Sequence, residues 1–149
     1  MDVFDAIVRG AEAESPVWAG ALLPPAERRP VTVFSPLAPQ RFALGLETVY
    51  EAYLVHYGSP RLFEAPESDE SILLGDYLYA HGLVRVAEVG GVPAVAALAD
   101  LIARCAALRA DGADGDGEAW VAAARALGGT PSESEIASAL ELHCGRVAA

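Results

Sequence analysis

The stretch SILLGDYLYAHGLVRVAEV, residues 71–89, decides the fold of this chain. On a helix this segment is apolar nearly all round, with Asp76 as an acidic residue among its apolar side chains. An apolar circumference is typical of a helix that other helices surround in a soluble protein. The sequence therefore predicts that residues 71–89 form the core helix of a helical bundle.

Asp76 is predicted to be a buried polar anchor within that helix. An aspartate in a fully buried helix costs several kcal/mol unless it is hydrogen-bonded or paired, so it should have a specific partner. Arg85 lies too far along the same helix, whereas Arg28, Arg29 and Arg61 are available from predicted loops. The alternative is that Asp76 belongs to the charged wall of an active site.

The preceding segment, QRFALGLETVYEAYLVH (residues 40–56), is predicted to form a second helix, which Gly58 and Pro60 end. A loop, RLFEAPESDE (residues 61–70), follows, with Ser68 as the expected N-cap of the next helix. The apolar stripe of the second helix consists of Phe42, Leu46, Val49, Tyr50, Tyr53 and Leu54.

Three more helices are predicted from apolar periodicity or punctuation. Residues 2–13 form a short amphipathic helix. Pro93 stands at a first helical position, and residues 94–109 follow it as a long helix. Residues 118–127 form a shorter one.

The terminal helix has the clearest local signature in the chain. Thr130 as N-cap, Pro131 in the first turn and Glu133 form a predicted capping box, and the helix should run to about Cys144. Residues 15–39, by contrast, contain six prolines and are predicted to be a connector with at most one helical turn.

Length and composition agree with one all-α domain. The chain has 149 residues, enough to bury a core without disulfides, and 53% of them are hydrophobic with few aromatics. We therefore predict a single helical domain over residues 1–149, an all-α bundle of about six helices with no internal repeat.

The charge and the cysteines exclude several classes of function. A formal net charge of −11, with no lysine, repels phosphate backbones and anionic lipid, so neither nucleic-acid binding nor electrostatic membrane anchoring is expected. Cys105 and Cys144 match no zinc spacing and imply no disulfide framework. The acidic start MDVFDAIVRGAEAE resembles no export signal and is too short to span. The expected location is the cytoplasm, with no membrane span.

Two candidate metal sites fail on spacing. In DGADGDGE, residues 111–118, a calcium loop read from Asp114 has Ala119 where a glycine belongs and Arg125 where a glutamate belongs, so a solvated loop is predicted. The three histidines fall on three different predicted helices without paired spacing, and no metal site is predicted from them.

Three stretches resemble trans-polyprenyl diphosphate synthases. ILLGDYLYAHGLVRVAEVGGVPAVAALADLIARCAAL, residues 72–108, is similar to the family's helix with a Gly-Asp-Tyr-Leu signature and the alanine-rich helix after it. LETVYEAYLVH, residues 46–56, is similar to the family's preceding helix, and ERRPV, residues 27–31, is similar to its diphosphate-gripping stretch. The resemblance covers residues 27–112 and implies a truncated isoprenoid-synthase-like fold.

The chain departs from that family at its metal-binding motif. Catalytic members have Asp-Asp-x-x-Asp, which binds magnesium and an allylic diphosphate. The aligned positions here are Tyr57, Gly58, Ser59, Pro60 and Arg61, none of which is a carboxylate. Prenyl transfer needs hard cations on oxygen ligands to take up the developing charge. The departure implies that the chain alone is not an enzyme and holds no cofactor, with magnesium on a catalytic partner.

Some members of the family are heteromers in which a short subunit without the Asp-rich motifs supports a catalytic subunit and its product length. The resemblance implies such a subunit, of a hexaprenyl or heptaprenyl diphosphate synthase, that docks through residues 40–56 and 71–89 and serves synthesis of a quinone side chain such as that of menaquinone. Ala52 and Tyr53 align with positions that line the family's product tunnel; for Tyr53, core packing and contact with the partner are the alternatives. The alternatives for the chain are a homo-oligomeric helical scaffold or binding module without prenyl chemistry, or a small prenyl-lipid-binding protein.

Overall fold

The computed structural model describes residues 2–64 and 69–147, and within these ranges every extended regular element is helical. The predicted all-α bundle of about six helices is confirmed. Ser68, the predicted N-cap, lies outside the described residues. The elements are α1 Val3–Glu14, α2 Pro16–Ala21, α3 Ala43–Tyr57, α4 Asp69–Ala110, α5 Asp116–Ala126 and α6 Glu133–Val147, with 3-10 turns η1 Pro25–Glu27, η2 Ser35–Leu37 and η3 Gln40–Phe42.

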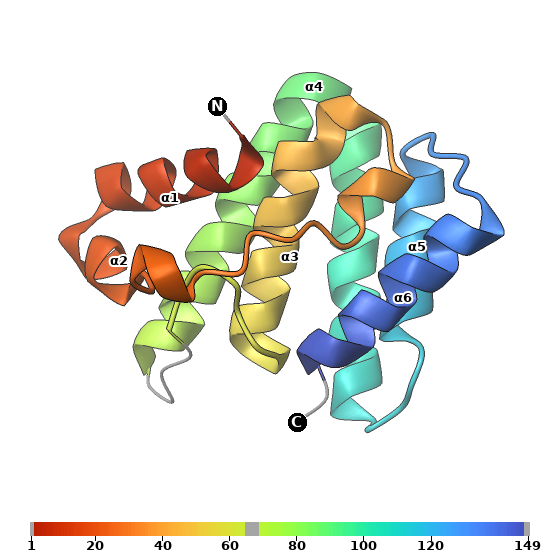
Figure 1. The fold of residues 1–149 in the computed structure, drawn as a ribbon. Coiled ribbons are helices and arrows are strands. Elements are labelled where there is room, and N and C mark those ends of the chain that lie inside the picture. The colour runs from red at the N-terminus through yellow and green to blue at the C-terminus, as the bar shows by residue number, and fades with distance from the viewer. Residues whose placement is uncertain (1, 65–68, 148–149) are drawn as a thin grey trace.

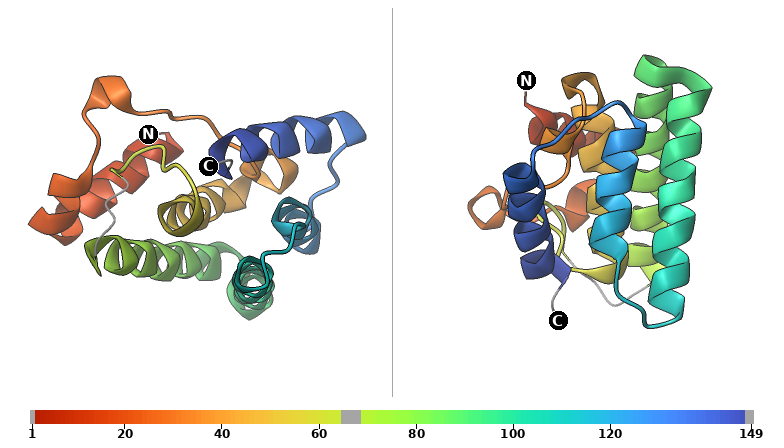
Figure 2. Two further views of the ribbon diagram at one scale, coloured as in Figure 1. Left: turned by 90° about the horizontal axis from the view of Figure 1, so that it is seen from below. Right: turned by 90° about the vertical axis from the view of Figure 1, so that its right-hand side faces the viewer.

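Helix α3 lies in the middle of the bundle (Figures 1 and 2). Helix α4 packs along one side of it, and α1 and the segment from α2 to η2 lie on the other side (Figure 2). Helices α5 and α6 complete the bundle at the right of Figure 1. Every residue of α3 from 45 to 55 is buried, so the core helix is α3 and the prediction that residues 71–89 fill this place is wrong.

Helix α4 consists of two arms that meet at Gly91, where the backbone adopts φ 65° and ψ −160°. This left-handed φ favours glycine, because a side chain would clash with the backbone there. Pro93 follows two residues later at the start of the second arm, which agrees with the helix predicted for residues 94–109. The two arms run side by side in the right-hand view of Figure 2.

The first arm of α4 approaches α3 closely because glycines face each other. A Cβ atom added to Gly82 would lie 2.5 Å from Val49 Cγ2 and 3.1 Å from the Val49 backbone nitrogen. A Cβ atom added to Gly45 would lie 2.4 Å from Val86 Cγ2. The two backbones therefore pack with no room for side chains between them, which fixes the register of the helix pair.

The core has two parts on the two sides of α3. One part joins α3 to the second arm of α4, to α5 and to η2, and Tyr50, Tyr53 and Trp120 are its largest members. In it the ring of Phe34 stacks on that of Trp120 at a centroid distance of 5.4 Å. The other part joins α1, the first arm of α4 and Phe63. Burial of these side chains supplies the main driving force for the fold.

Two local predictions need correction. The segment 15–39 contains the six-residue helix α2 and two 3-10 turns, which is more helix than the single turn expected. The Ser15 hydroxyl caps α2 by accepting from the Val17 nitrogen at 3.1 Å. The capping box of α6 is formed by Ser132 and Glu135, whose side chains each accept from the other's backbone nitrogen, and not by Thr130 and Glu133.

Candidate functional site

Asp76 is not buried, which overturns the predicted buried anchor. Its side chain is 67% exposed, and its carboxylate lies 3.8 Å from His56 Nε2. Arg61, one of the partners considered, is instead engaged with Glu47 and Glu51. Asp76 lies on the outward face of the first arm of α4, where an ionised carboxylate stays in water and needs no partner. An apolar circumference therefore did not mean burial on every side.

Gly75, beside Asp76, has the packing role that the aspartate lacks. A Cβ atom on Gly75 would lie 2.3 Å from His56 Nε2, so the glycine makes room for the imidazole ring. The His56 ring also stacks on Tyr79 at a centroid distance of 5.4 Å. Burial lowers the pKa of His56 below its ordinary value, although Asp76 opposes this shift. Between them, Gly75 and His56 join the C-terminal end of α3 to α4.

Arg61, at the last of the five degenerate motif positions, is fully buried between two glutamates of α3. Its Nη1 donates to Glu47 Oε1 at 2.6 Å, and its Nε donates to Glu51 Oε1 at 3.0 Å. The guanidinium also donates to the Val31 and Glu47 carbonyl oxygens. All three side chains are essentially inaccessible to solvent. The three residues form a closed charge cluster, which we call the Arg61 cluster.

The remaining acceptor capacity of the Arg61 cluster is used by backbone amides. Glu47 Oε2 accepts from the backbone nitrogens of Val33 and Ser35, each at 3.3 Å. Glu51 Oε2 accepts from the backbone nitrogens of Arg61 and Leu62 at 2.9 and 2.8 Å. Burial alone would lower the pKa of Arg61, but the two carboxylates raise it above its ordinary value, so the cation is retained. The cluster ties the loop after α3 and the segment before η2 to the core.

The other four degenerate motif positions form the end of α3 and the turn after it. Gly58 caps the helix by donating its backbone nitrogen to the Leu54 oxygen at 2.9 Å. The Ser59 nitrogen then donates to the Arg146 oxygen of α6 at 2.8 Å, and Pro60 is buried. The turn from Tyr57 to Arg61 is thus joined to the core by Arg61 and to α6 by Ser59.

A second polar network connects four helices around Asp116. The Asp116 carboxylate accepts from the Tyr53 hydroxyl, from Arg109 Nη2 at 3.0 Å and from His143 Nε2 at 2.9 Å. His143 Nδ1 lies 2.7 Å from the Tyr50 hydroxyl. The Asp116 carboxylate can only accept, so the neutral His143 ring carries its proton on Nε2. Its Nδ1 then accepts from the Tyr50 hydroxyl. Asp116 begins α5, so the prediction of a merely solvated loop over residues 111–118 is wrong at this residue.

The ionisation of the Asp116 network follows from its burial and its hydrogen bonds. Burial lowers the pKa of His143, against the opposing effect of Asp116. Burial would raise the pKa of Asp116, but hydrogen bonds from Tyr53 and His143 lower it below its ordinary value. At neutral pH the network therefore consists of a carboxylate, a neutral imidazole and the Arg109 cation. The Tyr50 and His143 end of this network is buried, whereas the side chains of Arg109 and Asp116 are 30% and 17% exposed.

Ala52 and Tyr53, the predicted tunnel or chain-length positions, both lie in the core. Ala52 packs in the α1 side of the core. Tyr53 is enclosed by aromatic rings, with Trp120 at 5.9 Å and Tyr57 at 5.1 Å between ring centroids, besides its bonds to Asp116 and Arg109. These contacts fill the space around Tyr53, as the core-packing alternative expects.

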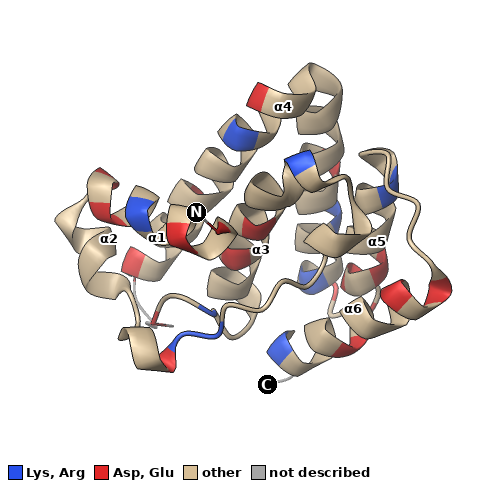
Figure 3. Ribbon diagram, turned by 45° about the horizontal axis from the view of Figure 1, so that its top comes forward, with Lys and Arg blue, Asp and Glu red and all other residues tan. Residues whose placement is uncertain are grey.

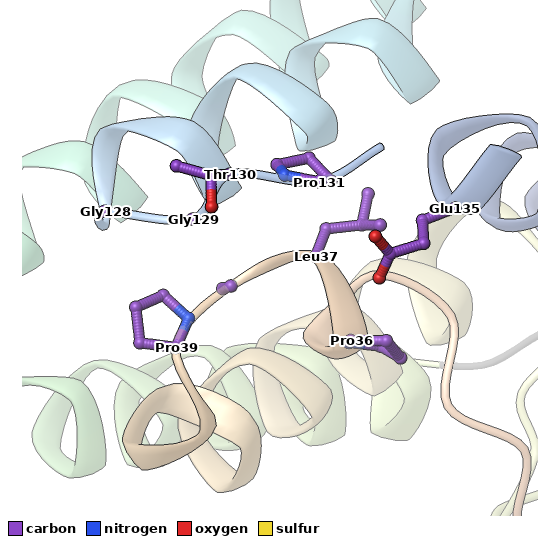
Figure 4. A pocket seen from close by; sticks show the side chains of 9 residues that line it. Pro36, Leu37, Pro39, Gly128, Gly129, Thr130, Pro131 and Glu135 are labelled. Atoms are coloured by element: carbon purple, nitrogen blue, oxygen red, sulfur yellow. The ribbon is translucent and has the colours of Figure 1, made fainter. Parts of the chain in front are cut away.

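One surface hollow lies between η2 and the loop that leads to α6 (Figure 4). Its volume is about 290 Å³, and its lining includes Pro36, Leu37, Pro39, Thr130 and Pro131. Glu135 supplies its one charged side chain, and this carboxylate already accepts from the Ser132 nitrogen. In the described ranges no group of three or more histidine, cysteine, aspartate or glutamate side chains is placed to hold a metal ion.

The outward face of α4 carries exposed apolar side chains. Leu73 and Val84 on the first arm are 58% and 55% exposed, and Val92 beyond the turn is 81% exposed. Exposed alanines lie between them at helical spacing, namely Ala80 and Ala87. We call Leu73, Ala80, Val84, Ala87 and Val92 the α4 face. Much of α4 is free of charged residues in Figure 3.

Helix α4 is long and apolar enough, by length and composition, to cross a membrane. Its most apolar 18-residue window has a mean hydropathy of 1.7, and 22% of that window is buried. The turn at Gly91 divides the helix into two arms, and each arm carries at least three charged residues. Charged residues are costly at the centre of a bilayer. A core helix passes the same test of length and composition, so the test alone assigns no span.

No protein-family model, no curated protein and no solved structure matches the chain. The function of the chain must therefore be inferred from its residues and from three features, namely the Arg61 cluster, the Asp116 network and the α4 face.

Proposed function

We propose that this chain is a non-catalytic subunit of a heteromeric long-chain polyprenyl diphosphate synthase. The single observation that carries the proposal is that the turn from Tyr57 to Arg61 has no carboxylate and no free charged side chain. These five residues align with the metal-binding motif of the family that the chain resembles, yet they offer no carboxylate. Their one charged side chain, that of Arg61, is buried and bound to Glu47 and Glu51.

A turn of this kind cannot supply the ligands on which prenyl transfer depends. Magnesium takes oxygen ligands, usually one or two carboxylates together with substrate phosphates. The Arg61 guanidinium is also poorly placed to bind a diphosphate, because it is buried and four of its five N–H donors are bonded to Glu47, Glu51 and Val31. The catalytic carboxylates and magnesium would then belong to the partner, and this chain would contribute structure and product length.

The α4 face supports an interaction role but corrects the expected docking helices. Residues 40–56 include most of the core helix α3, whose residues from 45 to 55 are all buried, so this part of the segment has no free face to dock through. The first arm of α4, residues 69–90, retains exposed Leu73 and Val84. Docking through residues 71–89 is the part of the hypothesis that we keep.

The test is co-expression with a catalytic polyprenyl diphosphate synthase from the same organism. We expect the two chains to co-purify, and the pair to make a long polyprenyl diphosphate from isopentenyl diphosphate, an allylic diphosphate and magnesium. The synthase without this chain is the control and should lose activity or change product length. Robust prenyl transfer by this chain alone would contradict the proposal.

A self-assembled helical scaffold is the second candidate, because a second copy would also cover the exposed α4 face. Light scattering separates the two candidates: the scaffold requires a stable homo-oligomer that ignores the synthase. A prenyl-lipid carrier finds less support, since the space around Tyr53 is filled by Trp120, Tyr57 and Asp116. A lipid that co-purifies with the chain would reverse this judgement.

A further inference from the structure

The α4 face has the geometry of a helix-docking surface. Leu73, Ala80, Val84 and Ala87 are spaced by seven, four and three residues, so they lie along one side of the first arm. All four are exposed, whereas Leu74, Leu78 and Val86 on the opposite side are buried. A contiguous exposed apolar stripe is the kind of feature that forms interaction surfaces.

The charges on α4 indicate what kind of surface would cover this stripe. The exposed charged residues of the helix are five acids and one base, Arg104. The two other arginines of α4 face inward: Arg85 donates to Thr48 at 2.8 Å and Arg109 binds Asp116. The exposed acids are Asp69, Glu70, Asp76, Glu88 and Asp100.

The same charges disfavour two other partners for the α4 face, a second copy of the chain and an anionic lipid surface. The exposed acids beside the α4 face form an acidic rim. A second copy related by a two-fold axis would bring this rim against the identical rim of its partner, because such an interface uses the same patch twice. Like charges placed together in this way oppose association. An anionic lipid surface would likewise be repelled by the acids and by the net charge of −11.

We infer that the α4 face docks an apolar helical surface of a different protein chain, and that basic side chains rim that partner surface. This inference rests on the proposed function, for which it specifies the docking face and the charge of the catalytic partner's surface. The apolar stripe supplies the affinity, and the acidic rim favours a basic partner over a second copy.

The first experiment tests, without the synthase, whether the α4 face prefers an apolar helix with basic edges. Two synthetic amphipathic helices carry the same Leu and Ala face, one with Arg and the other with Glu at the edges of that face. We expect the wild-type chain to bind the Arg-edged helix and not the Glu-edged one. Val84→Glu should weaken binding at least tenfold, equivalent to about 1.4 kcal/mol, although it adds a negative charge that would strengthen a non-specific attraction.

Leu142→Glu is the matched control, because Leu142 is an exposed apolar residue of α6 and the substitution changes the charge equally. This variant should bind the Arg-edged helix as the wild type does. Circular dichroism checks that both variants are folded. Equal binding by wild type and Val84→Glu would overturn the inference. So would a stable wild-type homodimer that Val84→Glu disrupts, or binding of the wild type to phosphatidylcholine and phosphatidylglycerol vesicles.

The second experiment uses the catalytic synthase as the probe and separates this inference from the proposed function. Co-purification of the wild type with loss on Val84→Glu and retention on Leu142→Glu would support both. Co-purification that both variants retain would overturn the docking face and leave the subunit role intact. A wild type that binds the Arg-edged helix through Val84 but not the synthase would contradict the subunit role alone.

Discussion

Helices α3 and α4 show opposite relations between polarity and burial. Helix α3 contains Glu47 and Glu51, yet both side chains are inaccessible to solvent. Helix α4 contains Leu73 and Val84, yet both are more than half exposed. The buried acids are tolerated because Arg61 and backbone amides satisfy them. The exposed apolar residues have no such explanation within the chain, which is why we assign them to a partner.

The largest expected effect comes from breaking the Arg61 cluster. Arg61→Met leaves two buried carboxylates without a cation and should lower the free energy of unfolding by about 3–5 kcal/mol. Urea denaturation measures this loss. Arg125→Ala, at an exposed arginine of α5, is the control and should change stability by less than about 0.5 kcal/mol.

A variant that also removes the two buried carboxylates tests whether unpaired charge causes that loss of stability. Adding Glu47→Gln and Glu51→Gln to Arg61→Met removes the uncompensated charge, while the amide oxygens still accept from backbone nitrogens such as that of Leu62. We expect the triple variant to be more stable than Arg61→Met alone. A triple variant that is less stable than the single variant would show that charge pairing is not what holds α3 in the core.

The second effect concerns the close contact between α3 and the first arm of α4. Gly82→Ala places a Cβ atom against the Val49 side chain and backbone, so we expect a loss of about 1–3 kcal/mol in the free energy of unfolding despite alanine's better helix propensity. Gly145→Ala in α6 meets nothing within 4 Å and should stabilise the chain by about 0.5–1 kcal/mol. If both variants were stabilised, the α3–α4 packing would be looser than described.

The third effect is a pH dependence from His143. Its pKa is lowered in the folded chain, so the unfolded chain binds more protons once the pH falls below the unfolded value of about 6.5. Stability should therefore decrease from pH 7 toward pH 5, by at most about 1.4 kcal/mol per pH unit for one histidine. His56 contributes in the same direction. Chemical denaturation across this range should give a shallower slope for His143→Gln, and an unchanged slope would contradict the assignment.

The smallest expected effect is on the α4 face. Val84→Glu should change the free energy of unfolding by less than about 0.5 kcal/mol, because Val84 is exposed in the free chain. Thermal and urea unfolding of the isolated chain measure this. A loss of several kcal/mol would mean that the α4 face is covered within the chain itself and is not free for a partner.

The sequence predicted the all-α class and the course of α3 well, because Leu46, Tyr50 and Tyr53 repeat at helical spacing and Gly58 ends the helix. It missed the burial of Glu47 and Glu51. The available signal was two acids four residues apart within an apolar helix, with Arg61 in the following turn. Pairing between them depends on how the turn folds back, which periodicity does not describe.

The error at Asp76 has a different physical origin. Hydropathy reports how much free energy a helix gains by burial. It does not say whether the same chain or another chain covers the helix. Helix α4 is apolar nearly all round, and the chain covers only one side of it. The capping box was displaced from Thr130 to Ser132 because TPSESE satisfies the pattern at two registers, and only the fold selects one.

The central claim is that the α4 face is free in the isolated chain and covered in a complex with the catalytic synthase. Maleimide labelling of Val84→Cys, read by mass spectrometry, tests this directly. Exposed Cys144 on α6 is an internal control, whereas Cys105 is buried and burial raises its pKa to about 12, which disfavours the reactive thiolate. We predict that saturating synthase slows labelling at position 84 at least tenfold and leaves Cys144 unchanged. Equal labelling at position 84 with and without bound synthase would contradict the claim.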